Sequence, residues 1–344
     1  MHDETHAFQI TVVPRAHWAA LAAFAFEANR RDDHRMRCLH FEQGHNAQAL
    51  ADEMLGLPEG EALFLGARLQ RQENGAWLGT IGAEIDPALG RAWLRGPLLA
   101  AGFAAADPAR ASALARSLIA ALRHALPEAI VRMDAFPQAD EALLCASYAA
   151  EGFEDRLVNH VLCATAPDTP AAAPAWPAPV FDSTHDETAA ARAAALHAAE
   201  FPEGYLTPSA LLATRDDGHR LLVARDPDGE GEVAGYVYVQ HDKACGDAYI
   251  DFVAVAPSAR GRGVGRALID AACHWAFVQR GLPRVNLTVR SDRAAALALY
   301  RSAGFVEVAA GRNFCARRSA VGGKGKFGVK RVPLCADKSL NRDG

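Results

Sequence analysis

Hydrophobic residues in the C-terminal half of the chain recur in two patterns, one typical of strands and one typical of helices. Residues 233–240 and 249–255 are rich in β-branched and aromatic side chains, as half-buried strands are. Beyond Gly263, apolar residues such as Leu268, Ala272 and Trp275 return at helical spacing. This order predicts an α/β domain whose sheet is antiparallel at first and later gains a strand–helix–strand unit. The expected elements are helices over residues 187–200, 263–280 and 294–303, and strands over residues 220–225, 233–240, 248–256, 284–290 and 305–309.

The chain also contains a faint internal repeat. Residues 148–153 read Y-x-x-x-G-F, and residues 300–305 repeat this pattern 152 positions later. Upstream, residues 110–119 align without gaps on residues 260–269 at an offset of 150. Two matches at nearly one offset indicate a duplicated domain.

A proline-rich stretch separates the two copies. Residues 166–179 contain five prolines, which remove backbone donors and fix φ, so this stretch is predicted to be a stiff linker. The first domain is expected over residues 1–165 and the second over residues 180–315. Residues 316–344 carry eight basic side chains against two acidic ones, and we expect a disordered basic tail there, without a catalytic role.

Length and composition favour a two-domain globular protein. At 344 residues, the chain is about twice the usual domain length of ~150 residues. Half of the residues are hydrophobic and 22% are charged, which excludes a disordered chain. The acidic start of the sequence and the absence of an apolar run near ~20 residues predict no secretion signal and no membrane span. A cytoplasmic location without a membrane partner is therefore expected.

Charge and cysteine usage narrow the expected partners. The residues before the tail carry a net charge of −11, which disfavours nucleic acid as a partner and favours a cationic substrate. The seven cysteines include no C-x-x-C pair, so neither a disulfide framework nor a zinc site is predicted. His34, His40 and His45 match no common zinc spacing, and no metal is expected. The sequence leaves both a monomer and a homodimer open.

The segment most informative about chemistry joins a strand to a helix through a glycine-rich turn. Residues 253–266 read V-A-V-A-P-S-A-R-G-R-G-V-G-R. Glycines let the backbone approach a ligand with its N–H groups outward, and the helix N-terminus adds a partial positive charge. The spacing lacks the lysine of a P-loop and the G-x-G-x-x-G of a dinucleotide fold. The turn is therefore predicted to bind phosphate groups by another arrangement.

This turn resembles the [RQ]-x-x-G-x-[GA] loop of the GNAT superfamily of acyl-CoA-dependent N-acetyltransferases. The flanking V-A-V-x-P and the later A-L-x-L-Y-x-x-x-G-F are similar to the same family. The resemblance is specific over residues 180–315. In the first copy it rests on the Y-x-x-x-G-F motif. It implies two tandem GNAT-like domains, each a mixed, mostly antiparallel sheet flanked by helices, with acetyl-CoA as co-substrate.

The resemblance also implies where coenzyme A is held. The backbone of Val253 and Val255 would pair with the pantetheine arm, and the loop would take the pyrophosphate. Many members have asparagine seven residues before the tyrosine, whereas this chain has Arg293, which could reach a phosphate instead. The implied coenzyme A contacts are Val253, Val255, Arg260, Gly261, Arg262, Gly263, Val264, Gly265, Arg266 and Arg293.

Amine acetylation needs a proton acceptor for the attacking ammonium and a proton donor for the leaving thiolate. Tyr300, which the resemblance places near the thioester sulfur, fits the donor, since a phenol with a pKa of about 10 is matched to a thiol. The acceptor is expected to be Asp251, acting through a water. The alternatives are that Tyr300 only packs the last helix and that Asp251 faces solvent at a bulge or pairs with an arginine.

Three further residues are candidate substrate contacts. Tyr249 lies on the same strand face as Asp251 and could position the water. Glu203 follows the first helix of the second copy, in a region that lines the acceptor site of similar proteins. Asn286 is expected opposite Val285 and Leu287 on its strand, facing either the acceptor cleft or solvent.

The first copy has lost the glycines of the turn. Alanine occupies all three aligned positions in residues 110–115, so this segment is predicted to continue a helix. We therefore predict that only the second domain binds acetyl-CoA. The predicted activity is transfer of an acetyl group to the primary amine of a small molecule. Three alternatives stay open: a non-catalytic acyl-CoA sensor, an enzyme similar to mycothiol synthases, and a protein N-acetyltransferase.

Overall fold

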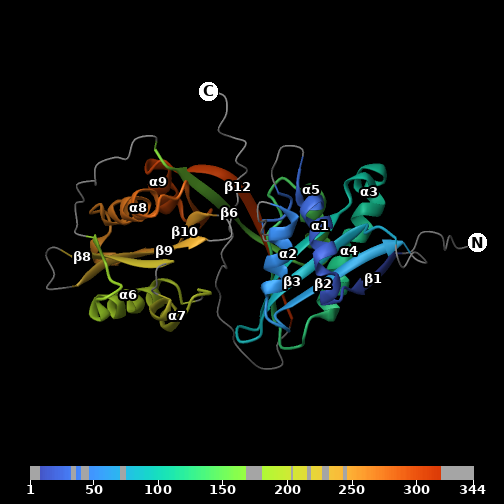
Figure 1. Ribbon diagram of the computed structural model, residues 1–344, viewed down its shortest axis with the longest axis horizontal. Coiled ribbons are helices and arrows are strands. Elements are labelled where there is room, and N and C mark those ends of the chain that lie inside the picture. Colours follow the sequence, from blue (N-terminus) through green and yellow to red (C-terminus); the bar gives the residue numbers. More distant parts are fainter. Residues whose placement is uncertain are drawn as a thin grey trace, which may run out of the picture. The chain divides into compact units, whose positions relative to one another are not determined.

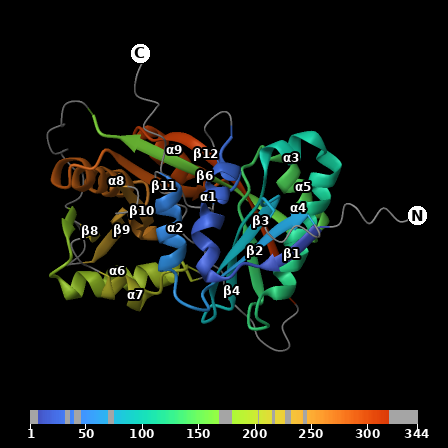
Figure 2. The same ribbon diagram turned by 45° about the vertical axis from the view of Figure 1, so that its right-hand side comes forward.

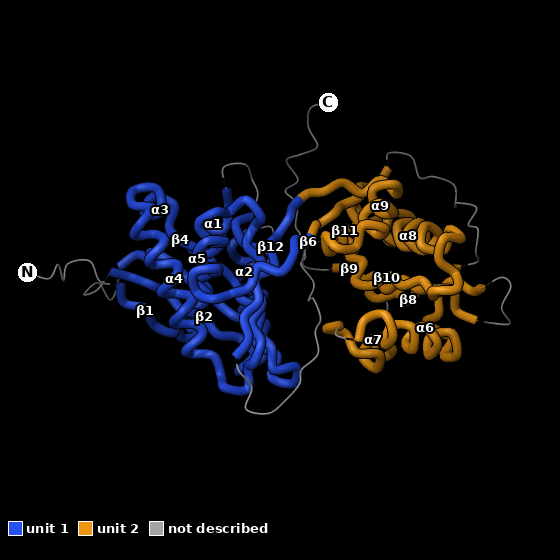
Figure 3. The backbone as a smooth tube through the Cα atoms, turned by 180° about the vertical axis from the view of Figure 1, so that it is seen from behind, with its two compact units in different colours: residues 1–159, 309–325, 334–344 blue, residues 160–308, 326–333 orange. Residues whose placement is uncertain are grey.

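The chain folds into two compact units (Figure 3). The computed structural model describes residues 8–31, 36–39, 46–69, 75–167, 180–202, 204–214, 218–226, 232–242 and 246–318. Of these, unit 1 takes residues up to 159 together with residues 309–318, and unit 2 takes residues 160–308. None of the helices in the described ranges is both long and apolar enough to span a membrane.

Unit 1 is a six-stranded sheet in the order β1-β2-β3-β4-β5-β12. Its strands pair antiparallel except for β4 and β5, which run parallel. Helices α4 and α5 pack on one face and α1 and α2 on the other. Its elements are β1 (Phe8–Val12), η2 (Arg15–His17), α1 (Trp18–Asn29), α2 (Ala47–Gly56), β2 (Ala62–Leu69), β3 (Gly79–Asp86), β4 (Arg91–Leu99), α3 (Ala101–Ala106), α4 (Pro108–Ala125), β5 (Arg132–Ala135), α5 (Ala142–Ala150) and parts of β6 (Glu154–Thr165) and β12 (Val306–Arg317).

Unit 2 repeats this architecture with the strand order β7-β8-β9-β10-β11-β6. Again one neighbouring pair, β10 and β11, is parallel, while β7, β8, β9 and β10 pair antiparallel. Figures 1 and 2 show α6 and α7 on one face of the sheet and α8 and α9 on the other. Its elements are β7 (Val180–Asp182), α6 (Glu187–Glu200), α7 (Pro208–Ala213), β8 (His219–Arg225), β9 (Val233–Asp242), β10 (Asp247–Val255), η3 (Pro257–Ala259), α8 (Val264–His274), η4 (Trp275–Gln279), β11 (Arg284–Arg290), α9 (Ala294–Ser302) and the remaining parts of β6 and β12.

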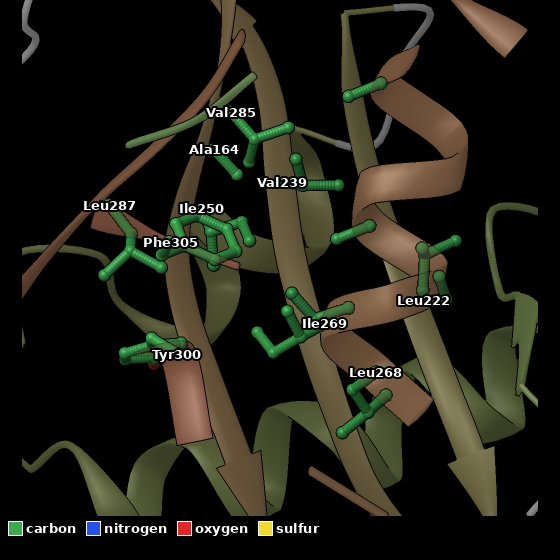
Figure 4. Packing of buried hydrophobic residues seen from close by; sticks show 14 of the residues in the cluster. Ala164, Leu222, Val239, Ile250, Leu268, Ile269, Val285, Leu287, Tyr300 and Phe305 are labelled. Atoms are coloured by element: carbon green, nitrogen blue, oxygen red, sulfur yellow. The ribbon is translucent and has the colours of Figure 1, made fainter. Parts of the chain in front are cut away.

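The helices and strands of unit 2 follow the sequence pattern closely. Helix α6 begins at Glu187 because the Asp186 side chain accepts a hydrogen bond from the Ala189 N–H (3.0 Å), which satisfies a donor of the first turn. The helix predicted over residues 263–280 is α8 continued by the π-helical segment η4. Apolar residues of α8 and α9 meet those of the sheet in one core, in which Ile250, Leu268 and Tyr300 lie (Figure 4).

The last strand of each copy pairs with the sheet of the other unit. The chain passes from unit 1 to unit 2 within β6, and returns to unit 1 within β12. The strand predicted over residues 305–309 therefore runs on to Arg317, and its residues 314–317 pair with β5. Ala316 and Arg317, which we expected in the tail, are strand residues, and the Arg318 guanidinium donates to the Pro127 carbonyl (2.8 Å). Residues 319–344 and residues 168–179 of the proposed linker lie outside the described residues.

A buried histidine fixes the segment between α6 and α7. The His197 ring donates from Nε2 to the Leu206 carbonyl (2.7 Å), because a carbonyl can only accept, and its Nδ1 accepts from the Tyr236 hydroxyl (2.6 Å). In its neutral form the ring thus makes a hydrogen bond with each of its two nitrogens. Burial lowers the pKa of His197 below its ordinary value of 6.5.

Unit 2 should therefore lose stability in mild acid through His197. Below pH 6.5 the unfolded chain takes up a proton that the folded histidine resists, so stability is fully present above this pH and falls below it. The expected slope is at most about 1.4 kcal/mol per pH unit. Unfolding midpoints of the wild type and of His197→Gln, measured from pH 7.5 down to 5.5, test this expectation. A slope of the same size in His197→Gln would contradict it.

Candidate active site

The parallel strands β10 and β11 separate in the middle of the unit 2 sheet. Their ladder runs only from Ala248 to Ile250 on β10, whereas the pairing of β10 with β9 continues to Val255. Asp251 is the additional residue of a β-bulge in β10, between Ile250 and Phe252. A bulge bends and twists its strand, and β10 leaves β11 directly after it.

The separation exposes a strand edge at the predicted pantetheine site. The Ala256 N–H donates to Ala234 (2.8 Å), toward β9. Because the backbone groups of successive strand residues point to opposite edges, those of Val253 and Val255 point toward the β11 side. The Val255 carbonyl does accept there, from the Arg260 guanidinium (3.2 Å). The β10–β11 ladder ends at Ile250, so an extended ligand could pair with the backbone of Val253 on this side. A ligand that pairs with the Val255 carbonyl would replace Arg260 there.

The glycine-rich turn has the backbone conformation that its sequence predicts. Gly261 and Gly263 have φ of +76° and +85°, a region that favours glycine. Gly263 directly precedes α8, and no side chain caps this helix end. The first N–H groups of α8 are therefore available to an anion. Gly265 differs, because a Cβ there would lie 3.1 Å from Leu299, so it also serves the packing of α8 against α9.

The arginines predicted to surround the phosphates are exposed and already make ion pairs. Arg260 pairs with Glu200 (2.6 Å), Arg262 with Asp226 (3.1 Å) and Arg266 with Asp270 (2.8 Å). An anion bound at the turn competes with these carboxylates. Arg293 is exposed at the start of α9, where its backbone N–H donates to Arg290 (3.0 Å).

Tyr300 lies on α9 within the core that also holds Ile250 and Leu287, the last paired residues of β10 and β11 (Figure 4). Its ring lies 6.0 Å from that of Phe305. Burial raises the pKa of Tyr300 to about 12. The phenol is thus protonated at neutral pH, and it is a weaker acid than the free tyrosine that the sequence analysis matched to a thiol.

Asp251 is half-buried on the face of the sheet covered by α6 and α7. The Tyr205 hydroxyl donates to one carboxylate oxygen, and the Gln240 amide donates to the other (2.5 Å). Asp251 lies at a bulge, as its alternative reading had it, but two side chains hold its carboxylate. Glu203, two residues before Tyr205, lies outside the described residues, as do His34, His40 and His45.

The two other predicted substrate contacts have partners within the sheet. The Tyr249 hydroxyl donates to Thr288 (2.8 Å). Asn286 lies opposite Val285 and Leu287 as expected, but it is only 2% exposed and donates to Asp247 (3.1 Å). Asp247 also pairs with Arg284 (3.0 Å). The solvent-facing alternative for Asn286 is therefore wrong, since its amide belongs to a buried polar cluster.

In unit 1, the helix N-terminus and the tyrosine hydroxyl that correspond to those of the unit 2 site are already bound to other groups of the protein. Residues 110–115 lie within α4, which confirms the predicted helix, and Asp107 caps its N-terminus by accepting from the Arg110 N–H (3.0 Å). A carboxylate thus occupies the end that a phosphate would need. Tyr148, the counterpart of Tyr300, is fully buried and donates to the Gly96 carbonyl (2.5 Å).

Unit 1 also carries the opposite charge at the bulge position. Counting from the parallel pairs Trp93–Asp134 and Tyr249–Asn286, Arg95 corresponds to Asp251. Arg95 pairs with Glu53 (2.8 Å) and with Glu84 (3.1 Å). A cation held by two carboxylates cannot accept a proton from an amine, so unit 1 lacks a base at this place.

Comparison with known proteins gives a family match for the second half. Residues 186–305, about a third of the chain, match the model of the Acetyltransferase (GNAT) family. Among solved structures, a GCN5-related N-acetyltransferase from Sphaerobacter thermophilus is similar over 97% of this chain and 100% of its own, with a TM-score of 0.63 and 18% identity. A tandem GNAT protein from the clavulanic acid biosynthesis pathway is similar over 90% of this chain and 98% of its own, with a TM-score of 0.56 and 15% identity.

The names of the sequence relatives are more specific than the name of the family. A mycothiol acetyltransferase of Salinispora tropica is 37% identical over 124 residues, which are 34% of this chain and 40% of the relative. One of Beutenbergia cavernae is 38% identical over 107 residues, which are 31% of this chain and 32% of the relative. The chain thus matches well under half of the length of these relatives. The structural similarity over both halves shows that the fold is two tandem GNAT-like units.

Tyr205 and Gln240 are the residues of this site that the sequence analysis missed. Neither belongs to a family motif, and Tyr205 lies outside any helix or strand. The one available signal is that Gln240 is the cross-strand partner of Tyr249, which places it beside Asp251 once the hairpin register is known.

Proposed function

We propose that unit 2 catalyses transfer of the acetyl group of acetyl-CoA to a primary amine of a small cationic molecule, by direct attack. The observation that carries the proposal is the separation of β10 from β11 beside a glycine turn that opens into α8. An open strand edge and a helix N-terminus at its end suit a long ligand with an amide-bearing arm and a pyrophosphate.

In this proposal Asp251 and Tyr300 handle the proton transfers of the reaction. Asp251 takes one proton of the attacking ammonium through a water and passes it to solvent. The amine nitrogen then forms a bond to the thioester carbonyl carbon, loses a second proton through the same water, and the C–S bond breaks. Tyr300 protonates the leaving thiolate and regains its proton from solvent. Two protons reach solvent and one is taken back, so the products are a neutral N-acetylated amine, coenzyme A thiol and one proton.

The acidic balance of the chain supports a cationic acceptor. The residues before 316 carry a net charge of −11. Negative charge attracts an ammonium group and disfavours acids. We therefore expect cationic amines to be preferred over acidic amino acids.

A second candidate is mycothiol acetylation, which the names of the sequence relatives favour. It uses the same donor and the same two protein groups, and differs only in the acceptor. A panel of amines that includes the acceptor of mycothiol acetyltransferases separates this candidate from a general amine acetyltransferase. A sensor would bind acetyl-CoA without releasing thiol in the presence of any amine.

Replacing Tyr300 with phenylalanine should lower kcat about 10- to 100-fold, the lower end of general acid catalysis, because water can partly replace the phenol. Acetyl-CoA affinity should stay unchanged, since the ring is retained. Free-thiol release with the best amine of the panel measures kcat, and titration calorimetry measures affinity. Tyr148→Phe is the matched control, and it should leave kcat unchanged. Wild-type rates in Tyr300→Phe would contradict the proposed acid.

A further inference from the structure

We propose that Tyr205 is a positioning residue for Asp251, and that Gln240 assists it. This inference rests on the proposed function of unit 2. The two side chains come from different elements and reach opposite oxygens of one carboxylate. The carboxylate plane is thereby fixed, because both of its oxygens accept a hydrogen bond.

Tyr205 is itself held rigidly, although it lies between helices. Its ring packs 5.1 Å from that of Phe252, the residue next to Asp251. The following residue, Leu206, accepts the hydrogen bond of the buried His197 (2.7 Å). The tyrosine ring and the residue that follows it are therefore both anchored, as a supporting group for catalysis must be.

Unit 1 offers an internal comparison for this arrangement. Its residue at the corresponding place, Arg95, is also held by a β3 side chain, Glu84, and by a side chain from the covering helices, Glu53. The holding geometry is thus common to both units, whereas the held group is a carboxylate only in unit 2. The donors that Tyr205 and Gln240 offer to Asp251 are both neutral, in contrast to the two carboxylates around Arg95.

The consequence is that the Tyr205 hydroxyl acts through Asp251 alone. Tyr205→Phe removes that hydroxyl and keeps the ring on Phe252. We expect kcat to fall about five- to twentyfold, with the KM for acetyl-CoA unchanged, because a loosened base loses part of its alignment. In an Asp251→Asn background, the same change should have no further effect.

Four proteins test this inference: the wild type, Tyr205→Phe, Asp251→Asn and the double variant. Thiol release gives kcat and KM for each, and thermal unfolding checks that each one folds. Tyr238→Phe is a matched control, because its hydroxyl bonds Thr214 (2.6 Å) on the same sheet face; its kcat should be unchanged.

The possible outcomes distinguish a failure of the positioning role from a failure of the proposed acetyl transfer. Equal fold losses from Tyr205→Phe in both backgrounds, or no loss in the wild-type background, would overturn the positioning role while the proposed activity stands. A wild type that binds acetyl-CoA and turns over no amine would overturn the proposed function, and the positioning role with it.

Discussion

Gly263→Asp is expected to abolish acetyl-CoA binding to the full-length protein. Gly263 has φ of +85° and stands directly before α8, so aspartate strains the turn and puts a negative charge where the pyrophosphate binds. Juxtaposed like charges typically oppose binding by several kcal/mol, which is a loss in affinity of about 100-fold or more. Titration calorimetry of acetyl-CoA into wild type and variant measures the change.

Gly281→Asp is the matched control for this result. Gly281 also has a positive φ, +63°, and open space around it, but it follows η4 instead of preceding a helix. It should suffer the same backbone strain and keep its affinity for acetyl-CoA. Unchanged binding in Gly263→Asp would remove the turn from the proposed site.

The same titration counts binding sites. We expect one site per chain, because Asp107 caps α4 and the Tyr148 hydroxyl is bound to Gly96 in unit 1. Two sites in the wild type, one of which survives Gly263→Asp, would mean that unit 1 also binds the donor.

Asp134→Ala is expected to destabilise unit 1 severely. Asp134 is fully buried on β5 and pairs with both Arg91 (2.7 Å) and Arg132 (2.7 Å). Burial lowers the pKa of Arg91, which marks how poorly its charge is solvated. Removing the shared carboxylate leaves two buried guanidinium groups uncompensated, and such a change typically destabilises by about 3–5 kcal/mol. Urea unfolding of the full-length protein measures the loss.

Asp155→Ala is the control for Asp134→Ala. Asp155 pairs with Arg312 (3.2 Å) in the same unit, and both side chains are exposed. Its loss should change stability by less than about 1 kcal/mol. A similar, small effect in Asp134→Ala would show that the buried cluster is not needed for folding.

Most of the fold of unit 2 could be predicted from the sequence, because its strands are rich in β-branched and aromatic residues and the apolar residues of α8 recur at helical spacing. The exchange of final strands could not, since a strand pattern carries no information about which sheet the strand joins. One signal was present: the Y-x-x-x-G-F repeat continues into Cys163-Ala164 and Cys315-Ala316, again 152 residues apart. This longer match shows that the repeat includes the final strands, but not which unit each one joins.

The residues of the candidate site were also predictable only in part. The glycine turn, Tyr300 and Asp251 were predictable because they lie in or next to contiguous motifs. Tyr205 and Gln240 were not, because only the bulge at Asp251 and the packing of the α6–α7 segment bring them to the carboxylate. The role of Asn286 depended on the buried charges of Asp247 and Arg284, which spacing alone does not reveal.

The exchanged strand also sets an order of events during synthesis. Cys315 pairs with Asp134 in the finished sheet, so β5 gains this neighbour only after residues 314–317 have been synthesised. Until then β5 presents an open edge, which is a site for pairing with other chains. A ribosome that stalls before these residues would leave unit 1 without its last strand.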